Sequence, residues 1–181
     1  MSWSELPAAN RRWLIVNAVV ITVAINLVLN AVIAVVAVGD RDLVPMWGAP
    51  LVETSVFWDL VGTLFLLPLF TSALVTAAVR RDIRLGAMSR LAPLPGVHHL
   101  LASPSRWRRG AAFGGLAVIA LAPGLLAILF GLGWPDLSKS QFIAWHTGFS
   151  IVLGIVVTPP LALFAMAAPD ASPPEDVRID D

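Results

Sequence analysis

The sequence contains no cysteine among its 181 residues. Disulfide exchange, catalysis by a thiolate, and metal or iron–sulfur sites held by cysteine are therefore excluded for this chain. Lysine is nearly absent as well, because eleven of the twelve basic residues are arginine, a bias that indicates a GC-rich bacterial genome. These absences narrow the chemistry without assigning a fold.

Charged residues are also scarce, at 13% of the chain against roughly 25% in soluble domains, while hydrophobic residues make up 57%. Four long stretches carry no charged residue, and they lie between Arg12 and Asp40, between Asp59 and Arg80, between Arg109 and Asp136, and between Lys139 and Asp170. A helix needs about 20 apolar residues to cross a hydrocarbon core about 30 Å thick. Each stretch is long enough, so the sequence predicts four membrane spans.

We therefore predict an all-α fold, a four-helix transmembrane bundle in one membrane domain that covers residues 1–169. The predicted spans are residues 14–38, 56–79, 110–132 and 143–167. A chain of 181 residues cannot hide four helices that are apolar all round inside a soluble core. The first apolar run is too long for the apolar region of a typical signal peptide, so we expect an uncleaved anchor.

Positive charge lies almost entirely on one side of the predicted spans. Ten of the twelve basic residues are on that side, and only Arg41 and Lys139 are opposite. Cytoplasmic segments retain arginine and lysine, so we predict that both termini and the central loop, residues 80–109, are cytoplasmic (N-in, C-in) in a bacterial inner membrane. Tryptophans near the ends of the spans agree, since this residue gathers at membrane interfaces.

The central loop carries seven arginines and one acidic residue, Asp82. We expect it to lie along the inner headgroup layer with its arginines on anionic lipid. The residues predicted to contact headgroups are Arg80, Arg81, Arg84, Arg106, Arg108 and Arg109. His98 and His99 are adjacent and point apart on any element, so they do not predict a metal site. The acidic, proline-rich tail, residues 170–181, is predicted to be disordered.

Polar residues inside the spans are the candidate functional residues, because hydrocarbon penalises polar groups that lack partners. Three sets recur at intervals of four residues: Thr22, Asn26 and Asn30 in the first span, Asp59 and Thr63 in the second, and His146 and Ser150 in the fourth. Asp59 and His146 lie about 12 Å outward of the span centres, and Asn30 about 6 Å outward. We predict that they converge on one polar cluster in the outer leaflet, where carboxylate and imidazole form a pH-responsive pair. The alternative is that these side chains reach the nearby interface or only bridge helices.

Small residues form one face of the third span. They are Gly110, Gly114, Ala117 and Gly124. Small residues let two helices approach closely, so this face is predicted to pack against another helix of the chain. Contact with a second copy of the chain or with a partner membrane protein is the alternative.

Recurrent tryptophans predict an internal repeat. The same spacing of eleven residues separates two pairs, Trp47 with Trp58 and Trp134 with Trp145. A shift of 87 positions relates the pairs and also places Asp59 on His146. Parallel duplication of this kind would produce two tandem helical hairpins that superpose, residues 12–80 and 108–167. Simple recurrence of interfacial tryptophans is the alternative.

The first hairpin carries three recognisable motifs: Val44-Pro45-Met46-Trp47-Gly48, Trp58-Asp59-Leu60-Val61-Gly62-Thr63, and a second span that ends in Thr76 and Arg80-Arg81. On these motifs the chain resembles uncharacterised bacterial four-span integral membrane proteins, mainly over the first hairpin, and the resemblance implies no activity. Small multidrug-resistance transporters place a glutamate in the first span, four-helix cytochrome b scaffolds need paired histidines within the membrane, and quinone-linked disulfide enzymes need cysteines. This sequence has none of these features.

The sequence shows no set of nucleophile, base and orienting residue, and no set of metal ligands. We therefore do not expect an enzyme, a cofactor, a metal or a nucleic-acid partner. The first functional hypothesis is a structural or accessory subunit, with the lipid bilayer and either a membrane protein or a second copy as partners. The second is a small transporter or proton-coupled permease that uses Asp59, His146 and Asn30.

Overall fold

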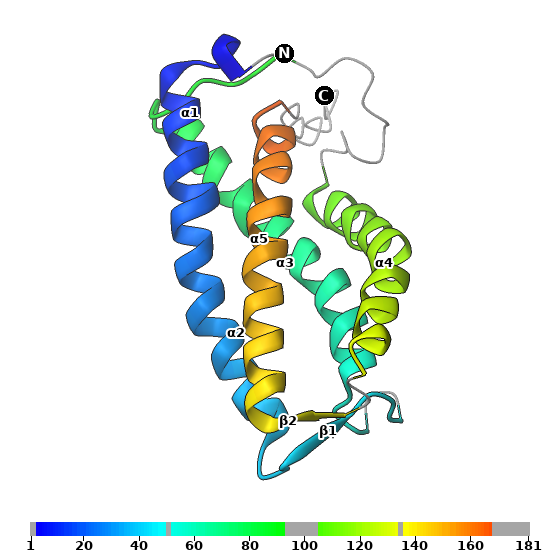
Figure 1. The fold of residues 1–181 in the computed structure, drawn as a ribbon. Helices are drawn as coiled ribbons and strands as arrows, with labels where there is room; N and C mark the ends of the chain where they lie inside the picture. The colour runs from blue at the N-terminus through cyan, green and yellow to red at the C-terminus, as the bar shows by residue number, and fades with distance from the viewer. Residues whose placement is uncertain (1–2, 50–51, 93–104, 134–135, 168–181) are drawn as a thin grey trace, which may run out of the picture.

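Four long apolar helices dominate the described part of the chain (Figure 1). The structure, a computed structural model, describes residues 3–49, 52–92, 105–133 and 136–167. Its elements are η1 Trp3–Glu5, α1 Ala8–Ile15, the π-helix η2 Val16–Ile21, α2 Thr22–Val38, β1 Leu43–Pro45, α3 Val56–Arg84, α4 Arg106–Gly131, β2 Asp136–Ser138 and α5 Lys139–Ala167. The segments α1, η2 and α2 join end to end, and each long helix is sufficiently long and apolar to cross a membrane. The prediction of four apolar helices is thus confirmed.

The helices that flank the central loop are longer than the sequence predicted. We call the end of the bundle where α3 ends and α4 begins the inner end. There α3 runs on to Arg84 and α4 already begins at Arg106. Gly86 ends α3 with a φ of 70°, and its N–H donates to the carbonyl of Ile83 at 3.0 Å. The arginines at these two helix ends therefore lie on helical turns, which corrects the predicted loop, 80–109.

Two sequence predictions lie outside the described residues. They concern the acidic tail, residues 170–181, and the adjacent histidines, His98 and His99.

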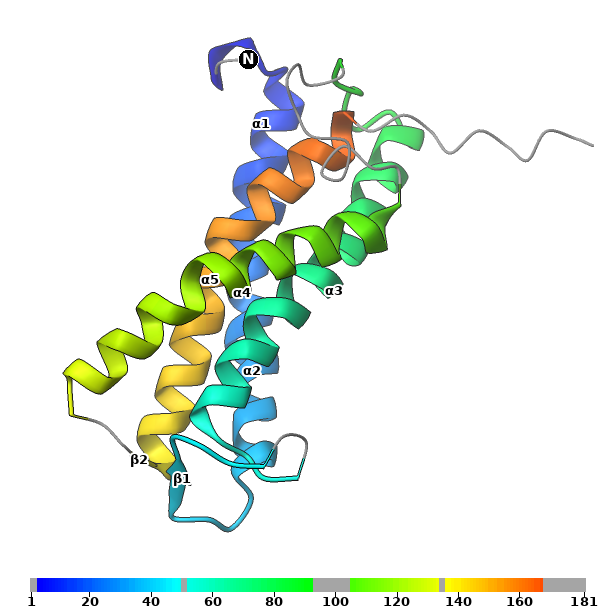
Figure 2. The same ribbon diagram turned by 90° about the vertical axis from the view of Figure 1, so that its right-hand side faces the viewer.

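Helix α5 lies at the centre of the packing. Both α2 and α3 pack along it, and α4 packs on α3 (Figures 1 and 2). Within the sequence hairpins the helices lie farther apart. Helices α2 and α3 make almost no contact with each other, and α4 reaches α5 through side chains such as Phe113 and Phe164, whose ring centroids lie 5.7 Å apart. The closely packed pairs are α2 with α5, α3 with α5, and α3 with α4. In a repeat of two hairpins, α2 would correspond to α4 and α3 to α5. Replacing each helix by its counterpart gives the same three pairs, as such a repeat requires. Superposition of the halves stays a prediction, and Trp134 lies outside the described residues.

Small residues bring α4 onto α3, which it crosses obliquely (Figure 2). A Cβ atom at Gly110 would lie 2.8 Å from the backbone of α3, and one at Gly114 would lie 2.6 Å from it. The close approach expected at these two glycines is present, and Ala117 packs beside the same interface. Gly124 is exposed, with no atom within 4 Å of its Cβ position, because the buried face of α4 continues through Ala122 instead. This corrects the predicted packing face.

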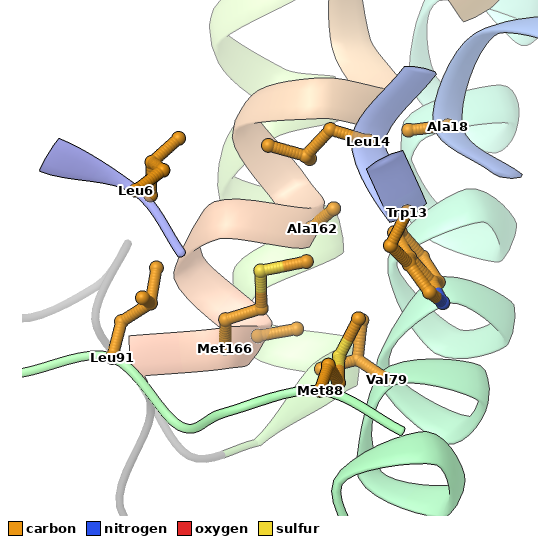
Figure 3. Close-up of a cluster of buried hydrophobic side chains, with 10 residues drawn as sticks. Leu6, Trp13, Leu14, Ala18, Val79, Met88, Leu91, Ala162 and Met166 are labelled. Carbon is orange, nitrogen blue, oxygen red and sulfur yellow. The ribbon is translucent and has the colours of Figure 1, made fainter. Parts of the chain in front are cut away.

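The inner end is closed by the N-terminal segment and by the chain that follows α3. Apolar side chains from these segments, α3 and α5 meet there (Figure 3): Leu6, Trp13, Leu14, Val79, Met88, Leu91 and Met166. The Nδ2 of Asn10 donates to the carbonyl of Ser89 at 2.7 Å, and the N–H of Ser89 donates to Asn10 Oδ1 at 3.2 Å. At the opposite, outer end, β1 pairs antiparallel with β2 and joins the two outer loops.

Candidate functional site

A cleft separates α2 from α3 over most of the height of the bundle. Its volume is about 620 Å³, it is open along one side, and α5 contributes His146 to its lining. Trp13 lines its inner end, and Trp58 and Asp59 line its outer end. Along α3 it extends from Asp59 to Ala78, which is about 28 Å at 1.5 Å per residue. This length is close to the thickness of a hydrocarbon core, about 30 Å.

Side-chain hydrogen bonds join the two walls at both ends of the cleft. At the inner end, Trp13 Nε1 donates to a carboxylate oxygen of Asp82 on α3 at 2.8 Å. At the outer end, Thr54 Oγ1, just before α3, donates to the carbonyl of Ala37 on α2 at 2.8 Å. The cleft is thus held at its ends, and its long open side faces the surroundings of the bundle.

Polar residues of α2 line one wall of the cleft and are linked by a series of hydrogen bonds. Asn30 Nδ2 donates to Asn26 Oδ1 at 2.8 Å, and Asn26 Nδ2 donates to the carbonyl of Thr22 at 2.9 Å. Thr22 Oγ1 in turn donates to the carbonyl of Asn17 at 3.2 Å. A Cβ atom at Gly154 would lie 2.7 Å from Asn26 Nδ2, so this glycine allows α2 to lie directly on α5. These bonds lower the penalty of placing amides at membrane depth.

The π-helix η2 extends the polar wall toward the inner end. Its hydrogen bonds span five residues, so Asn17 lies one turn from Thr22 on the cleft wall. The predicted polar set follows a spacing of four residues outward from Thr22, so it did not include Asn17. Only apolar residues surround Asn17 in this segment, so no sequence signal marks the change of helix type.

Asp59 and His146 meet at the outer end of the cleft, as expected from their matched depth. His146 Nδ1 lies 2.8 Å from Asp59 Oδ1 and 3.0 Å from Oδ2. Asp59 lies in the first turn of α3, where the helix dipole favours a carboxylate. His146 is 3% exposed, and its Nε2 is buried without a partner among the described residues. The pair joins α3 to α5, and its part in function stays a prediction.

The other predicted site residues divide into two groups. Asn26, Asn30 and Thr63 line the same cleft as the Asp59–His146 pair. Ser150 is buried in α5 outside the cleft lining, and its hydroxyl has no partner in the ranges that the structure describes. The predicted polar cluster therefore reaches the cleft without Ser150.

Arg109 lies between α3 and α4 and not among lipid headgroups. Its side chain is fully buried, and its guanidinium donates to Thr76 Oγ1 and, at 3.4 Å, to Ser72 Oγ. The close approach of the two helices at Gly110 encloses it, which corrects the predicted headgroup contact. The sequence signal that could have identified this site is the pair of hydroxyl side chains, Ser72 and Thr76, four residues apart on α3. The other predicted headgroup residues are exposed or half-buried: Arg80, Arg81, Arg84, Arg106 and Arg108.

Within the described part of the chain, no group of three or more histidine, aspartate and glutamate side chains is placed to hold a metal ion. No protein-family model, no curated protein and no solved structure matches this chain. A function for the cleft therefore has to come from its own geometry.

Proposed function

We propose that this chain is a multi-pass protein of the bacterial inner membrane that holds one lipid-like chain in the cleft between α2 and α3 and catalyses no reaction. Four helices long and apolar enough to span a membrane support the location. The arginines at the inner end support a cytoplasmic position for both termini and a contact with anionic lipid. The observation that carries the proposal is the cleft, since its length nearly equals the thickness of a hydrocarbon core.

The mean cross-section of the cleft limits which molecules it can hold. A volume of 620 Å³ spread over about 28 Å corresponds to a mean cross-section of about 22 Å². A helix with its side chains is at least about 10 Å wide and needs about 80 Å². A polymethylene chain, about 4–5 Å wide from the contact distances of carbon atoms, needs about 12–20 Å². One acyl or alkyl chain therefore fits inside the cleft, whereas a whole helix is too wide to be enclosed by it. Holding such a chain is compatible with the accessory role that the sequence favours.

Filling the cleft tests this function. Gly62 lies on the α3 wall with open space at its Cβ position, so Gly62→Leu is expected to occupy the cleft without a clash. Gly124 on α4 also has open space there but is outside the cleft, so Gly124→Leu is the matched control. Native mass spectrometry of protein purified in mild detergent should detect one retained lipid on the wild type and on Gly124→Leu, and none on Gly62→Leu. Equal retention by the two variants, or no retention by the wild type, would contradict the proposal.

A proton-coupled permease is the second candidate, and the contact between Asp59 and His146 favours it. A histidine changes its charge between about pH 5 and 8, and this one lies at the end of a cleft of membrane height. Proton relays through a membrane use chains of titratable residues. Among the described residues that line the cleft, there is no aspartate, glutamate or histidine beyond this pair. Binding of a chain therefore stands as the first proposal.

A further inference from the structure

We propose that the polar end of the bound chain is an amine or ammonium group that binds Asp59 at the outer end of the cleft. The inference rests on the proposed function and adds the chemistry of the guest. Three observations carry it: the free acceptor positions of Asp59, the unpartnered nitrogen of His146, and the residue types that line the cleft.

The carboxylate of Asp59 keeps acceptor positions that face the cleft. A carboxylate has two oxygens with about four lone-pair positions. In the described part of the chain, its hydrogen-bond partner is His146 Nδ1, which lies within 3.0 Å of both oxygens and has one proton to share between them. The Asp59 side chain is 14% exposed and lines the cleft. A guest in the cleft can therefore donate to this carboxylate.

Among the described residues that line the cleft, Asp59 has no permanently positive partner. The buried Nε2 of His146 has no acceptor among the described residues, and a second proton there would bury an unpaired N–H on a charged ring. Nδ1 is thus the imidazole nitrogen that is placed to donate to the carboxylate. None of the described residues that line the cleft is lysine or arginine. Because an ionised carboxylate at membrane depth is unfavourable unless it is paired, an ammonium group on the guest would stabilise it.

Asn30 supplies another acceptor in the outer half of the cleft. Its Nδ2 donates to Asn26, and its carbonyl oxygen has no partner among the residues that the structure describes. A protonated amine has three N–H donors, so it can bind the carboxylate and still donate to a neighbouring carbonyl. A carboxylate or phosphate at the same place would instead meet the like charge of Asp59. The hydrocarbon chain would run inward past Gly62 toward Trp13.

The test compares three probes with the same chain and different polar ends: hexadecylamine, hexadecanol and hexadecanoate. Binding to the purified full chain is measured by native mass spectrometry at matched concentrations. We expect hexadecylamine to bind about tenfold more tightly than the other two, since hydrogen bonds to charged groups are the stronger ones. Asp59→Asn should remove this preference, so that hexadecylamine binds no more tightly than hexadecanol. Asp40→Asn removes an exposed carboxylate from the outer loop and should keep the preference.

Asp59→Glu separates the loss of charge from a loss of fold, because it keeps the carboxylate and should keep a preference for the amine. Equal binding of the three probes to the wild type, or tightest binding of hexadecanoate, would overturn the amine assignment and leave the chain-binding function in place. No binding of any probe would overturn the proposed function itself. Once the amine preference is seen, retention of phosphatidylethanolamine over phosphatidylglycerol identifies a lipid headgroup as the source. Retention of neither lipid identifies a free long-chain amine.

Discussion

Asp59 takes part both in the inferred binding of an amine and in the permease candidate. As a binding residue it offers acceptor positions to a guest, and in a permease it would exchange a proton with His146. Its contact with His146 also joins α3 to α5, so it contributes to the packing in either case. A test of Asp59 therefore has to measure stability and function separately.

A double-mutant cycle measures how much the contact between Asp59 and His146 contributes to the free energy of unfolding. Asp59→Asn or His146→Leu alone leaves the other group at membrane depth without its partner, so each should lower the free energy of unfolding by about 1–2 kcal/mol. The double variant should lose less than the sum of the two, as measured by reversible unfolding in bicelles. Additive losses would argue against a direct contact.

The same Asp59→Asn variant distinguishes the two functions. If the cleft holds a chain, proton flux into reconstituted vesicles should be the same for the wild type and for this variant. A pH-dependent flux that only the wild type supports would favour the permease.

At the scale of helices, glycines at two interfaces allow the packed helices to approach closely. Gly114 brings α4 onto the backbone of α3, and Gly154 brings α2 onto α5. Because α2 and α3 both lie on α5 and make almost no contact with each other, the cleft stays open between them.

Two adjacent glycines of α4 allow a matched test of this packing. A Cβ atom at Gly114 would lie 2.6 Å from the carbonyl oxygen of Phe65, which belongs to a helix backbone and cannot easily move. Gly114→Ala should therefore lower the free energy of unfolding by about 1–3 kcal/mol. Gly115 has open space at its Cβ position, so Gly115→Ala should raise stability by up to about 1 kcal/mol through helix propensity. Chemical unfolding in one detergent compares them, and equal effects would argue against the tight α3–α4 contact.

The whole molecule is expected to be oriented by its arginines. A reporter fused after Gly86 follows the arginines of α3, and one fused after Asp40 follows the outer end of α2. We expect green fluorescent protein to fluoresce when fused at Gly86, and alkaline phosphatase to be active when fused at Asp40. Active phosphatase at Gly86 would mean that the arginines had been translocated and would contradict the N-in, C-in topology.

The sequence by itself determined the four apolar helices and part of the candidate site. Charge-free stretches of about 20 residues or more are sufficient to predict spans, because length and hydropathy alone meet the requirement of a bilayer. The contact of Asp59 with His146 was predictable as well. Rise per residue sets the depth of a side chain in a helix, and polar side chains at one depth favour each other over hydrocarbon.

Only the tertiary structure decided which helix faces meet. It buried Arg109 between α3 and α4, left Gly124 exposed, and opened the cleft between α2 and α3. The physical reason is that lipid tails are as apolar as leucine, so hydrophobicity does not distinguish a face that packs on a helix from one that faces lipid. The packed faces are set by the close approach at particular glycines, by the crossing angle of α4 and by the π-helix at Asn17. Each of these depends on contacts between distant parts of the chain.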